Sequence, residues 1–311
     1  MSLLVIGSIA LDTLETPFGK VEYAVGGSGT FISTSASYFY DDIKLIGIVG
    51  TDFPNEELEF LKSRNIDISG VLKHPEKKTF HWHGKYNYDL NTRDSIVTEL
   101  NAFEDFNPEI PASFRDSPYI CLGNVDPEIQ LKVINQLTNP KIIMMDTMNF
   151  WIEMKKNKLF ETMKHVNIIS INDSEARELT GEYNLVSAAK RMKELGPEII
   201  VIKKGEHGAL LFNGNNVFAA PALPLENVFD PTGAGDSFAG GFMGWIAGTD
   251  DTSLDNLKLA MIYGSAIASI SVEKFSLEGL RELSNSSIEE RLNSFKNLTQ
   301  FDFPVNGKSN N

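Results

Sequence analysis

The sequence predicts an α/β protein with a mostly parallel central sheet whose two faces are covered by helices. Short apolar runs rich in β-branched residues recur along the 311-residue chain. They do not alternate in polarity, which is typical of strands buried on both faces. Helical patterns separate these runs, and strands that alternate with helices form a parallel sheet between two helical layers. The predicted strands are LLVIGS (3–8), IKLIGIVG (43–50), YICLGN (119–124), KIIMMD (141–146), VNIISIN (166–172) and EIIVIKKG (198–205).

Two of the intervening segments have clear helical patterns, PEIQLKVINQLTN (127–139) and LVSAAKRMKELG (185–196). In the second, apolar residues recur at spacings of three and four from Leu185 to Leu195. Gly196 then supplies a helix stop signal.

Two further segments depart from this alternation. Residues 73–100 contain an aromatic, partly alternating stretch from Thr79 to Tyr88, which favours exposed strands. Residues 11–25 also lack a helical pattern. Together they predict a small β lid over one end of the main sheet, and its exposed strands suit a homodimer through the lid. A plain surface hairpin is the alternative.

Composition excludes several classes of protein. Acidic residues outnumber basic ones 42 to 28, and a net charge of −14 repels nucleic acid and anionic lipid, so neither is expected as a partner. The opening MSLLVIGSIALD has no basic region before its apolar run, which predicts a first strand and not a signal peptide. With no apolar run of membrane-spanning length, we expect a cytoplasmic protein. We expect a single domain over residues 1–305 and a disordered tail over 306–311.

The stretch DPTGAGDSFAGG (230–241) predicts an anion site. Phe238, Phe242 and Ile246 recur at helical spacing, so the glycines before them lie at the amino terminus of a buried helix. Free backbone N–H groups and roughly +0.5 of a charge are found at such a terminus. The small residues Gly233, Ala234 and Gly235 leave these N–H groups open to a phosphate.

Asp236 has two readings on local physics alone. A carboxylate beside a bound phosphate can accept the proton of an attacking hydroxyl. Alternatively, Asp236 caps the helix while Asp230 closes a turn before Pro231.

The full stretch DPTGAGDSFAGGF resembles the carboxy-terminal signature of the PfkB (ribokinase-like) family of carbohydrate and nucleoside kinases. The resemblance implies a ribokinase-like three-layer α/β/α fold with a small β lid. It also implies an anion hole formed by Gly233, Ala234 and Gly235, with Asp236 as the catalytic base. Asp230 and Thr232 fall where some members bind a monovalent cation such as K⁺.

Other segments resemble the family on the acceptor side. AVGGSGTFISTSASYF (24–39) resembles its amino-terminal glycine pair at the substrate site, here Gly26 and Gly27. GSIALD (7–12) resembles the first strand and the substrate-binding acid, here Asp12. DTMNFW (146–151) resembles a segment near the substrate, which makes Asp146 a candidate substrate residue. Alone, the glycines could form a turn and Asp12 could be a loop acid.

On the nucleotide side, INDSEARELTG (171–181) resembles the family's N-x-x-E motif, here Asn172 and Glu175, which organises Mg²⁺ and phosphate through water. The same pair also fits a helix capping box. VIKKGEHGALLF (201–212) resembles the nucleotide-contacting strand and turn, here Lys203 and Gly205. Lys203 could alone be a solvated strand end.

The sequence also departs from the family's pattern. Phe31 stands where ribokinase-like sugar kinases have an asparagine that contacts the sugar, which makes Phe31 a candidate substrate residue, although a phenyl ring lacks that amide's donor and acceptor. Polar contacts to the acceptor could instead come from lid residues such as Arg93, with solvated lid residues as the alternative. Lys203 replaces a threonine common in ribokinases.

These observations predict an ATP- and Mg²⁺-dependent kinase that phosphorylates a hydroxyl of a sugar or sugar derivative. A nucleoside kinase is the alternative. A ligand-binding member without catalysis is disfavoured because Asp236, Asn172 and Glu175 are all present.

Overall fold

The computed structural model describes residues 1–300, built around one nine-stranded sheet. The strand order is β13-β12-β11-β10-β9-β8-β1-β4-β5. Neighbouring strands from β11 to β5 run parallel. Beyond β11 the sheet continues with two antiparallel strands, β12 and β13. The main strands are β1 (Leu3–Ile6), β4 (Ile43–Val49), β5 (Ile66–Lys73), β8 (Tyr119–Leu122), β9 (Ile142–Asp146), β10 (Ile168–Asn172), β11 (Ile199–Lys203), β12 (Ala209–Asn213) and β13 (Asn216–Ala220). The six strands predicted from apolar runs are all present, so the mostly parallel sheet is confirmed.

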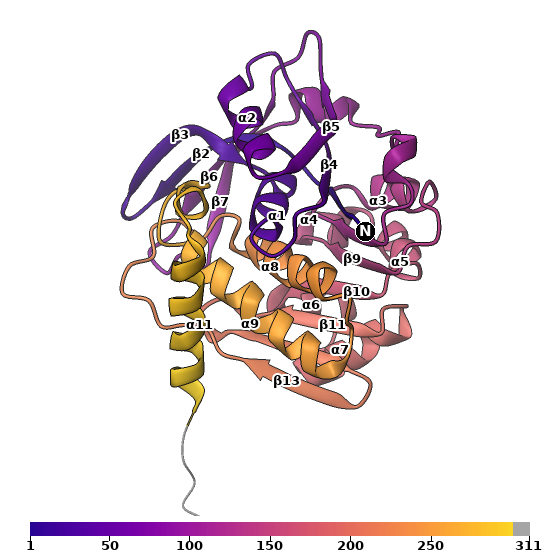
Figure 1. Ribbon diagram of the computed structural model, residues 1–311, viewed down its shortest axis with the longest axis vertical. Coiled ribbons are helices and arrows are strands. Elements are labelled where there is room, and N and C mark those ends of the chain that lie inside the picture. Colours follow the sequence, from indigo (N-terminus) through magenta and orange to yellow (C-terminus); the bar gives the residue numbers. More distant parts are fainter. Residues whose placement is uncertain (301–311) are drawn as a thin grey trace, which may run out of the picture.

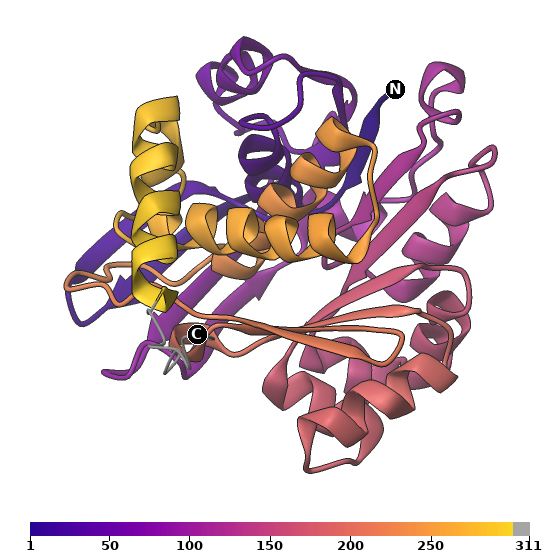
Figure 2. The same ribbon diagram turned by 60° about the horizontal axis from the view of Figure 1, so that its bottom comes forward.

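Helices cover both faces of the sheet and bury two separate apolar cores (Figures 1 and 2). One core is packed by α1, α8 and α9, and the other by α3, α4, α5, α6 and α7. The helices are α1 (Ser28–Ala36), α2 (Asn55–Ser63), α3 (Pro127–Ile134), α4 (Asn149–Met154), α5 (Lys156–Met163), α6 (Asp173–Thr180), α7 (Leu185–Glu194), α8 (Ala234–Thr249), α9 (Leu254–Ser271), α10 (Glu278–Arg281) and α11 (Asn285–Thr299). The result is the predicted three-layer α/β/α fold.

A second, four-stranded sheet forms the lid. Its order is β3-β2-β6-β7, in which β2 and β6 run parallel and the outer pairs antiparallel. The strands are β2 (Ala10–Thr16), β3 (Gly19–Gly26), β6 (Phe80–Tyr86) and β7 (Arg93–Glu99). Both segments expected to form a lid therefore pair with each other, and β6 and β7 make a hairpin whose tip is residues 87–92.

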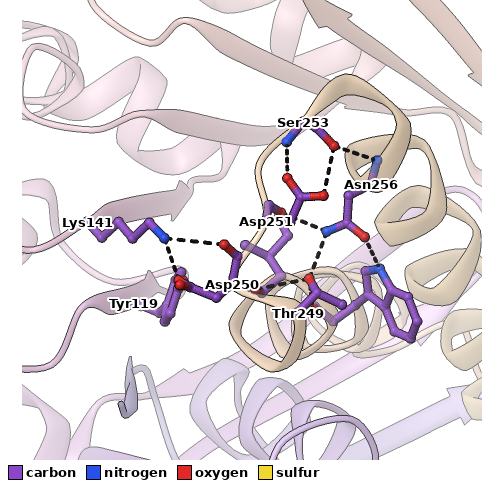
Figure 3. Close-up of polar contacts among 9 residues, drawn as sticks. Tyr119, Lys141, Thr249, Asp250, Asp251, Ser253 and Asn256 are labelled. Atoms are coloured by element: carbon purple, nitrogen blue, oxygen red, sulfur yellow. Dashed lines mark hydrogen bonds and ion pairs between the residues drawn. The ribbon is translucent and has the colours of Figure 1, made fainter.

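Polar contacts fix the far end of α8 against the start of β8 (Figure 3). The hydroxyl of Tyr119, the first residue of β8, donates to the carboxylate of Asp250, which Lys141 also contacts. Asp250 ends α8 in a left-handed conformation, with φ of 52°. Because this end lies beside the amino-terminal ends of the strands, the amino terminus of α8 points to their carboxyl ends, where ligands bind in open α/β sheets.

Cys121 is buried in β8, within the predicted strand YICLGN. No helix within residues 1–300 is long and apolar enough to cross a membrane. The tail predicted to be disordered, 306–311, lies outside the described residues.

Candidate active site

The predicted anion hole lies at the first turn of α8. Gly233 precedes the helix with φ of 75°, a left-handed conformation that favours glycine. A Cβ on Gly233 would also lie 2.5 Å from the ring of Phe31, which is 1% exposed. Phe31 thus packs beneath the turn, and its expected contact with the acceptor stays a prediction.

Asp236 lies in the first turn of α8, one residue beyond the anion hole. Burial and the nearby Asp146 carboxylate raise its pKa from 3.8 to about 7, against the opposing charges of Lys203 and Arg93. A carboxylate with this pKa is a stronger base than an ordinary aspartate and is still substantially ionised at neutral pH. Asp236 therefore has the protonation behaviour that a general base needs.

Lys203 and Asp146 form an ion pair below this turn. Lys203 ends β11 and Asp146 ends β9, and their Nζ and Oδ2 atoms are 2.6 Å apart. Burial opposes the charge of Lys203, but Asp146 holds its pKa above the usual value. A Cβ on Gly235 would lie 3.1 Å from the lysine Nζ, so the ammonium group borders the anion hole. This position of Lys203 suits a phosphate contact. Asp146 pairs with the lysine, and the role of Asp146 in substrate binding stays a prediction.

Asn172 and Glu175 form the capping box at the start of α6. The Glu175 N–H donates to Asn172 Oδ1 at 2.8 Å, and the Asn172 N–H donates to Glu175 Oε2 at 3.0 Å. Burial and the Asp146 charge raise the pKa of Glu175 to about 7. The structural and the functional readings of this motif are therefore compatible, since the same carboxylate caps a helix and borders the site.

The donor set fits Mg²⁺ bound with a nucleotide. Within residues 1–300 no three ligating acids, histidines or cysteines gather into a ready-made metal cage. Mg²⁺ commonly keeps several waters and binds one or two carboxylates together with substrate phosphates. Glu175, which is buried and near enough to Asp236 to raise the pKa of that residue, is the residue that would hold such an ion through water.

Asp12 lies on the lid side of the site, in β2. Burial, then the charges of Asp230 and Asp236, raise its pKa to about 8. Its Oδ1 has no hydrogen-bond partner among the described residues. A Cβ on Gly26 would collide with the Asp12 carboxyl group, which explains one glycine of the pair, and Gly27 is the residue before α1. A buried acid with an unused oxygen is suited to bind a hydroxyl group.

Asp230 and Thr232 lie beside the lid. Asp230 is fully buried, and its two carboxylate oxygens accept the backbone N–H groups of Thr232 and Ser276, each at 2.9 Å. Burial raises its pKa. No basic side chain of residues 1–300 pairs with this carboxylate, so its surroundings fit a monovalent cation. Its binding stays a prediction.

A 480 Å³ pocket opens beside the anion hole. Lys203, Gly205, Ala234 and Gly235 line one end of it, and the contact of Lys203 and Gly205 with a nucleotide stays a prediction. Its other walls are mostly apolar and come from residues 222–228 and from α9.

Two lid features were missed from sequence. The hydroxyl of Tyr86 accepts a hydrogen bond of 3.0 Å from Thr232 Oγ1, and Leu90 of the hairpin tip lines the pocket. The alternation along β6 could have placed Tyr86 on the inner face. No local pattern in the sequence predicts which part of the main domain the hairpin tip will contact.

The sequence is similar to those of known kinases. The family model described as pfkB family carbohydrate kinase matches residues 2–281. The cytidine kinase of Thermococcus kodakarensis is 34% identical over 247 residues, covering 78% of this chain and 87% of that protein.

Two solved structures share the fold. The nucleoside kinase of Methanocaldococcus jannaschii superimposes with a TM-score of 0.75 at 21% identity, over 94% of this chain and 98% of that one. A putative ribokinase II of E. coli in complex with ATP and Mg²⁺ gives a TM-score of 0.78 at 17% identity, over 95% and 99% of the two chains. With a family match over nearly its whole length, the chain belongs to the pfkB family of carbohydrate kinases and is itself a kinase.

Proposed function

We propose that this protein transfers the γ-phosphate of ATP to a hydroxyl group of a nucleoside, with Asp236 as general base. The observation that carries the proposal is the position of Asp236. It directly follows Gly233 to Gly235 at the start of α8, its charge helps to raise the pKa of the buried Asp12, and its own pKa is raised to about 7. The pocket beside Lys203 and Gly235 takes the nucleotide. The putative ribokinase II of E. coli, which shares the fold, was solved in complex with ATP and Mg²⁺.

In the reaction, Asp236 accepts the proton of the acceptor hydroxyl as its oxygen attacks the γ-phosphorus. The bond from that phosphorus to the β,γ-bridging oxygen breaks, and ADP leaves. The backbone N–H groups of Gly233 to Gly235 and the ammonium group of Lys203 stabilise the charge that develops on the transferring phosphate. Mg²⁺, held through water by Glu175, would neutralise charge on the phosphates. The lid would exclude water, the competing acceptor.

Two observations favour a nucleoside as acceptor over a simple sugar. One is the similarity to a cytidine kinase. The other is Trp82, which pairs in register with Asp12 between β6 and β2 and so lies on the same face of the lid. An indole beside the hydroxyl-binding carboxyl group provides a stacking surface for a nucleobase. A sugar kinase is the second candidate, since the family model is that of carbohydrate kinases.

The test is ADP release from Mg·ATP against nucleosides, with cytidine first, and against pentoses, hexoses and sugar acids. Turnover with a nucleoside well above that with any free sugar supports the proposal. Turnover only with sugars would move the acceptor to the second candidate. ATP binding without turnover on either class would favour a protein that only binds its ligands.

We also propose that the lid mediates a homodimer. Its apolar side chains Phe18, Tyr23 and Ile96 are more than half exposed, and β3 and β7 are edge strands with unpaired backbone groups. Sedimentation should detect dimers at micromolar concentration, and a purely monomeric species would contradict this assembly.

A further inference from the structure

We propose that the β6–β7 hairpin belongs to the phosphate-donor site: Arg93 binds the transferring phosphate, and the hairpin tip borders the nucleotide. This rests on the proposed kinase function and deepens it. The sequence alone suggested Arg93 only as a contact for the acceptor.

The register of the hairpin determines which way Arg93 points. Arg93 pairs directly with Tyr86 across the antiparallel strands β6 and β7. Directly opposed residues project from the same face of a sheet. Tyr86 is 6% exposed, and its hydroxyl accepts a hydrogen bond from Thr232, one residue before the anion hole. The same face therefore carries the guanidinium group toward the start of α8.

The electrostatics of the site agree with this direction. The positive charge of Arg93 lowers the pKa of both Asp236 and Glu175, against the larger effect of burial. The charge of Glu175 also raises the pKa of Asp236, so Arg93 acts on two carboxylates that lie near each other. The guanidinium group also lies over the Trp82 ring, with Cζ 5.7 Å from the ring centroid, so its side chain is supported from the lid.

The hairpin tip reaches the nucleotide pocket itself. Asp89, Leu90 and Asn91 line that pocket together with Gly205. A Cβ on Gly205 would lie 3.2 Å from Asn91 Oδ1, so the lid tip and the nucleotide-binding turn are in close contact. Asp89 shapes the tip by accepting hydrogen bonds of 3.1 Å from the N–H groups of Asn91 and Thr92.

These contacts give the hairpin two tasks. Trp82, on the inner face of the hairpin, and Asp12, on the neighbouring strand β2, lie on the acceptor side. Arg93 and the hairpin tip lie on the donor side. The terminal phosphate would therefore draw the lid closed. A planar guanidinium group suits this role, because it can give two parallel hydrogen bonds to a phosphate.

The experiment compares binding of Mg·AMP-PNP, which has a terminal phosphate, with that of Mg·ADP, which lacks it, by calorimetry on the full chain. Arg93→Gln should weaken AMP-PNP binding by about 10-fold to 100-fold and leave ADP binding close to that of the wild type. Lys85→Gln is the matched control. Lys85 pairs with Asp94, the next residue pair along the hairpin, so it projects from the opposite face. It should leave both affinities unchanged.

A second, double variant tests the hairpin tip. Leu90→Ala combined with Asn91→Ala should weaken AMP-PNP and ADP alike, because the tip borders the part of the pocket that both ligands share. Melting temperatures of all variants should match the wild type within a few degrees.

The outcomes separate the two proposals. If Arg93→Gln binds AMP-PNP like the wild type, or loses both ligands equally, Arg93 does not bind the terminal phosphate. If the wild-type protein binds both ligands but turns over no acceptor, the proposed phosphate transfer to a nucleoside fails, while the contrast between the two ligands still decides the role of Arg93. If it binds neither ligand, both proposals are overturned.

Discussion

Replacement of Asp236 by asparagine is the most direct test of the mechanism. Asparagine has nearly the same shape but cannot accept a proton from the acceptor hydroxyl. Loss of a general base lowers kcat by about 10²-fold to 10⁴-fold, which corresponds to roughly 3–5 kcal/mol in the activation free energy. ATP affinity should remain, because the nucleotide is bound by other groups.

The raised pKa of Asp236 also predicts the pH dependence of the wild-type enzyme. Burial and the Asp146 charge raise this pKa to about 7, and only the ionised carboxylate is an active base. About half of the molecules are then active at pH 7 and about one tenth at pH 6, so kcat/KM should rise with pH between 6 and 8.

The stability of the protein should change in the opposite sense. A carboxylic acid whose pKa is raised by folding stabilises the protein at low pH, and this contribution is lost as the pH rises through the folded-state pKa. The asparagine side chain of the Asp236→Asn variant is uncharged and avoids this loss. The variant should therefore melt at pH 8 at a temperature no lower than that of the wild type.

The assay is the initial rate of ADP release with Mg·ATP and the acceptor identified by the panel, from pH 5.5 to 8.5. Asp255→Asn, the same chemical change on an exposed surface of α9, is the control and should retain wild-type rates. An Asp236→Asn enzyme within threefold of the wild type, or a wild-type profile that is flat from pH 6 to 8, would refute the assignment of Asp236 as the base.

The other predictions concern the surroundings of Asp236. Lys203→Met should abolish turnover and lower the free energy of unfolding by about 3–5 kcal/mol, because it leaves the Asp146 carboxylate buried without its partner. Urea denaturation measures this loss of stability. Combining Lys203→Met with Asp146→Asn should restore most of the stability but not the activity. An unrestored double variant would argue against the broken ion pair as the cause of the destabilisation. Asp12→Asn should raise the KM of the acceptor about tenfold or more while the Kd of ADP stays constant, and a change confined to ADP would contradict its place at the acceptor. Gly233→Ala should cost about 1–2 kcal/mol from its positive φ alone, with a further cost from contact with the Phe31 ring, measured by thermal unfolding; an unchanged melting temperature would contradict this account.

Much of the fold follows from local patterns in the sequence. Unbroken apolar runs such as IIMMD and IIVIK predict strands buried on both faces, and β9 and β11 occupy those residues. The spacing of Phe238, Phe242 and Ile246 predicts the buried face of α8, and the glycine-rich segment before it predicts where that helix begins. Periodicity suffices here because burial of one face or of both faces of an element leaves a regular trace in the chain.

The candidate site was predicted only in part. The sequence located Gly233, Gly235 and Asp236, because a helix terminus and its first turn are local features. It gave Phe31 no packing partner. The proximity of this ring to Gly233 depends on how α1 packs against α8.

By itself, the sequence determined the alternation of strands and helices, the glycine-rich turn before α8, the family and the existence of a separate β lid. Only the tertiary structure decided which charges meet. Asp146 and Lys203 are 57 residues apart and form an ion pair because β9, β10 and β11 are neighbours in the sheet. Arg93 projects from the same face of the lid as Tyr86 because the two residues pair across β6 and β7. A local pattern states how an element is buried, whereas the order and register of strands, which depend on the whole chain, set the distances between functional groups.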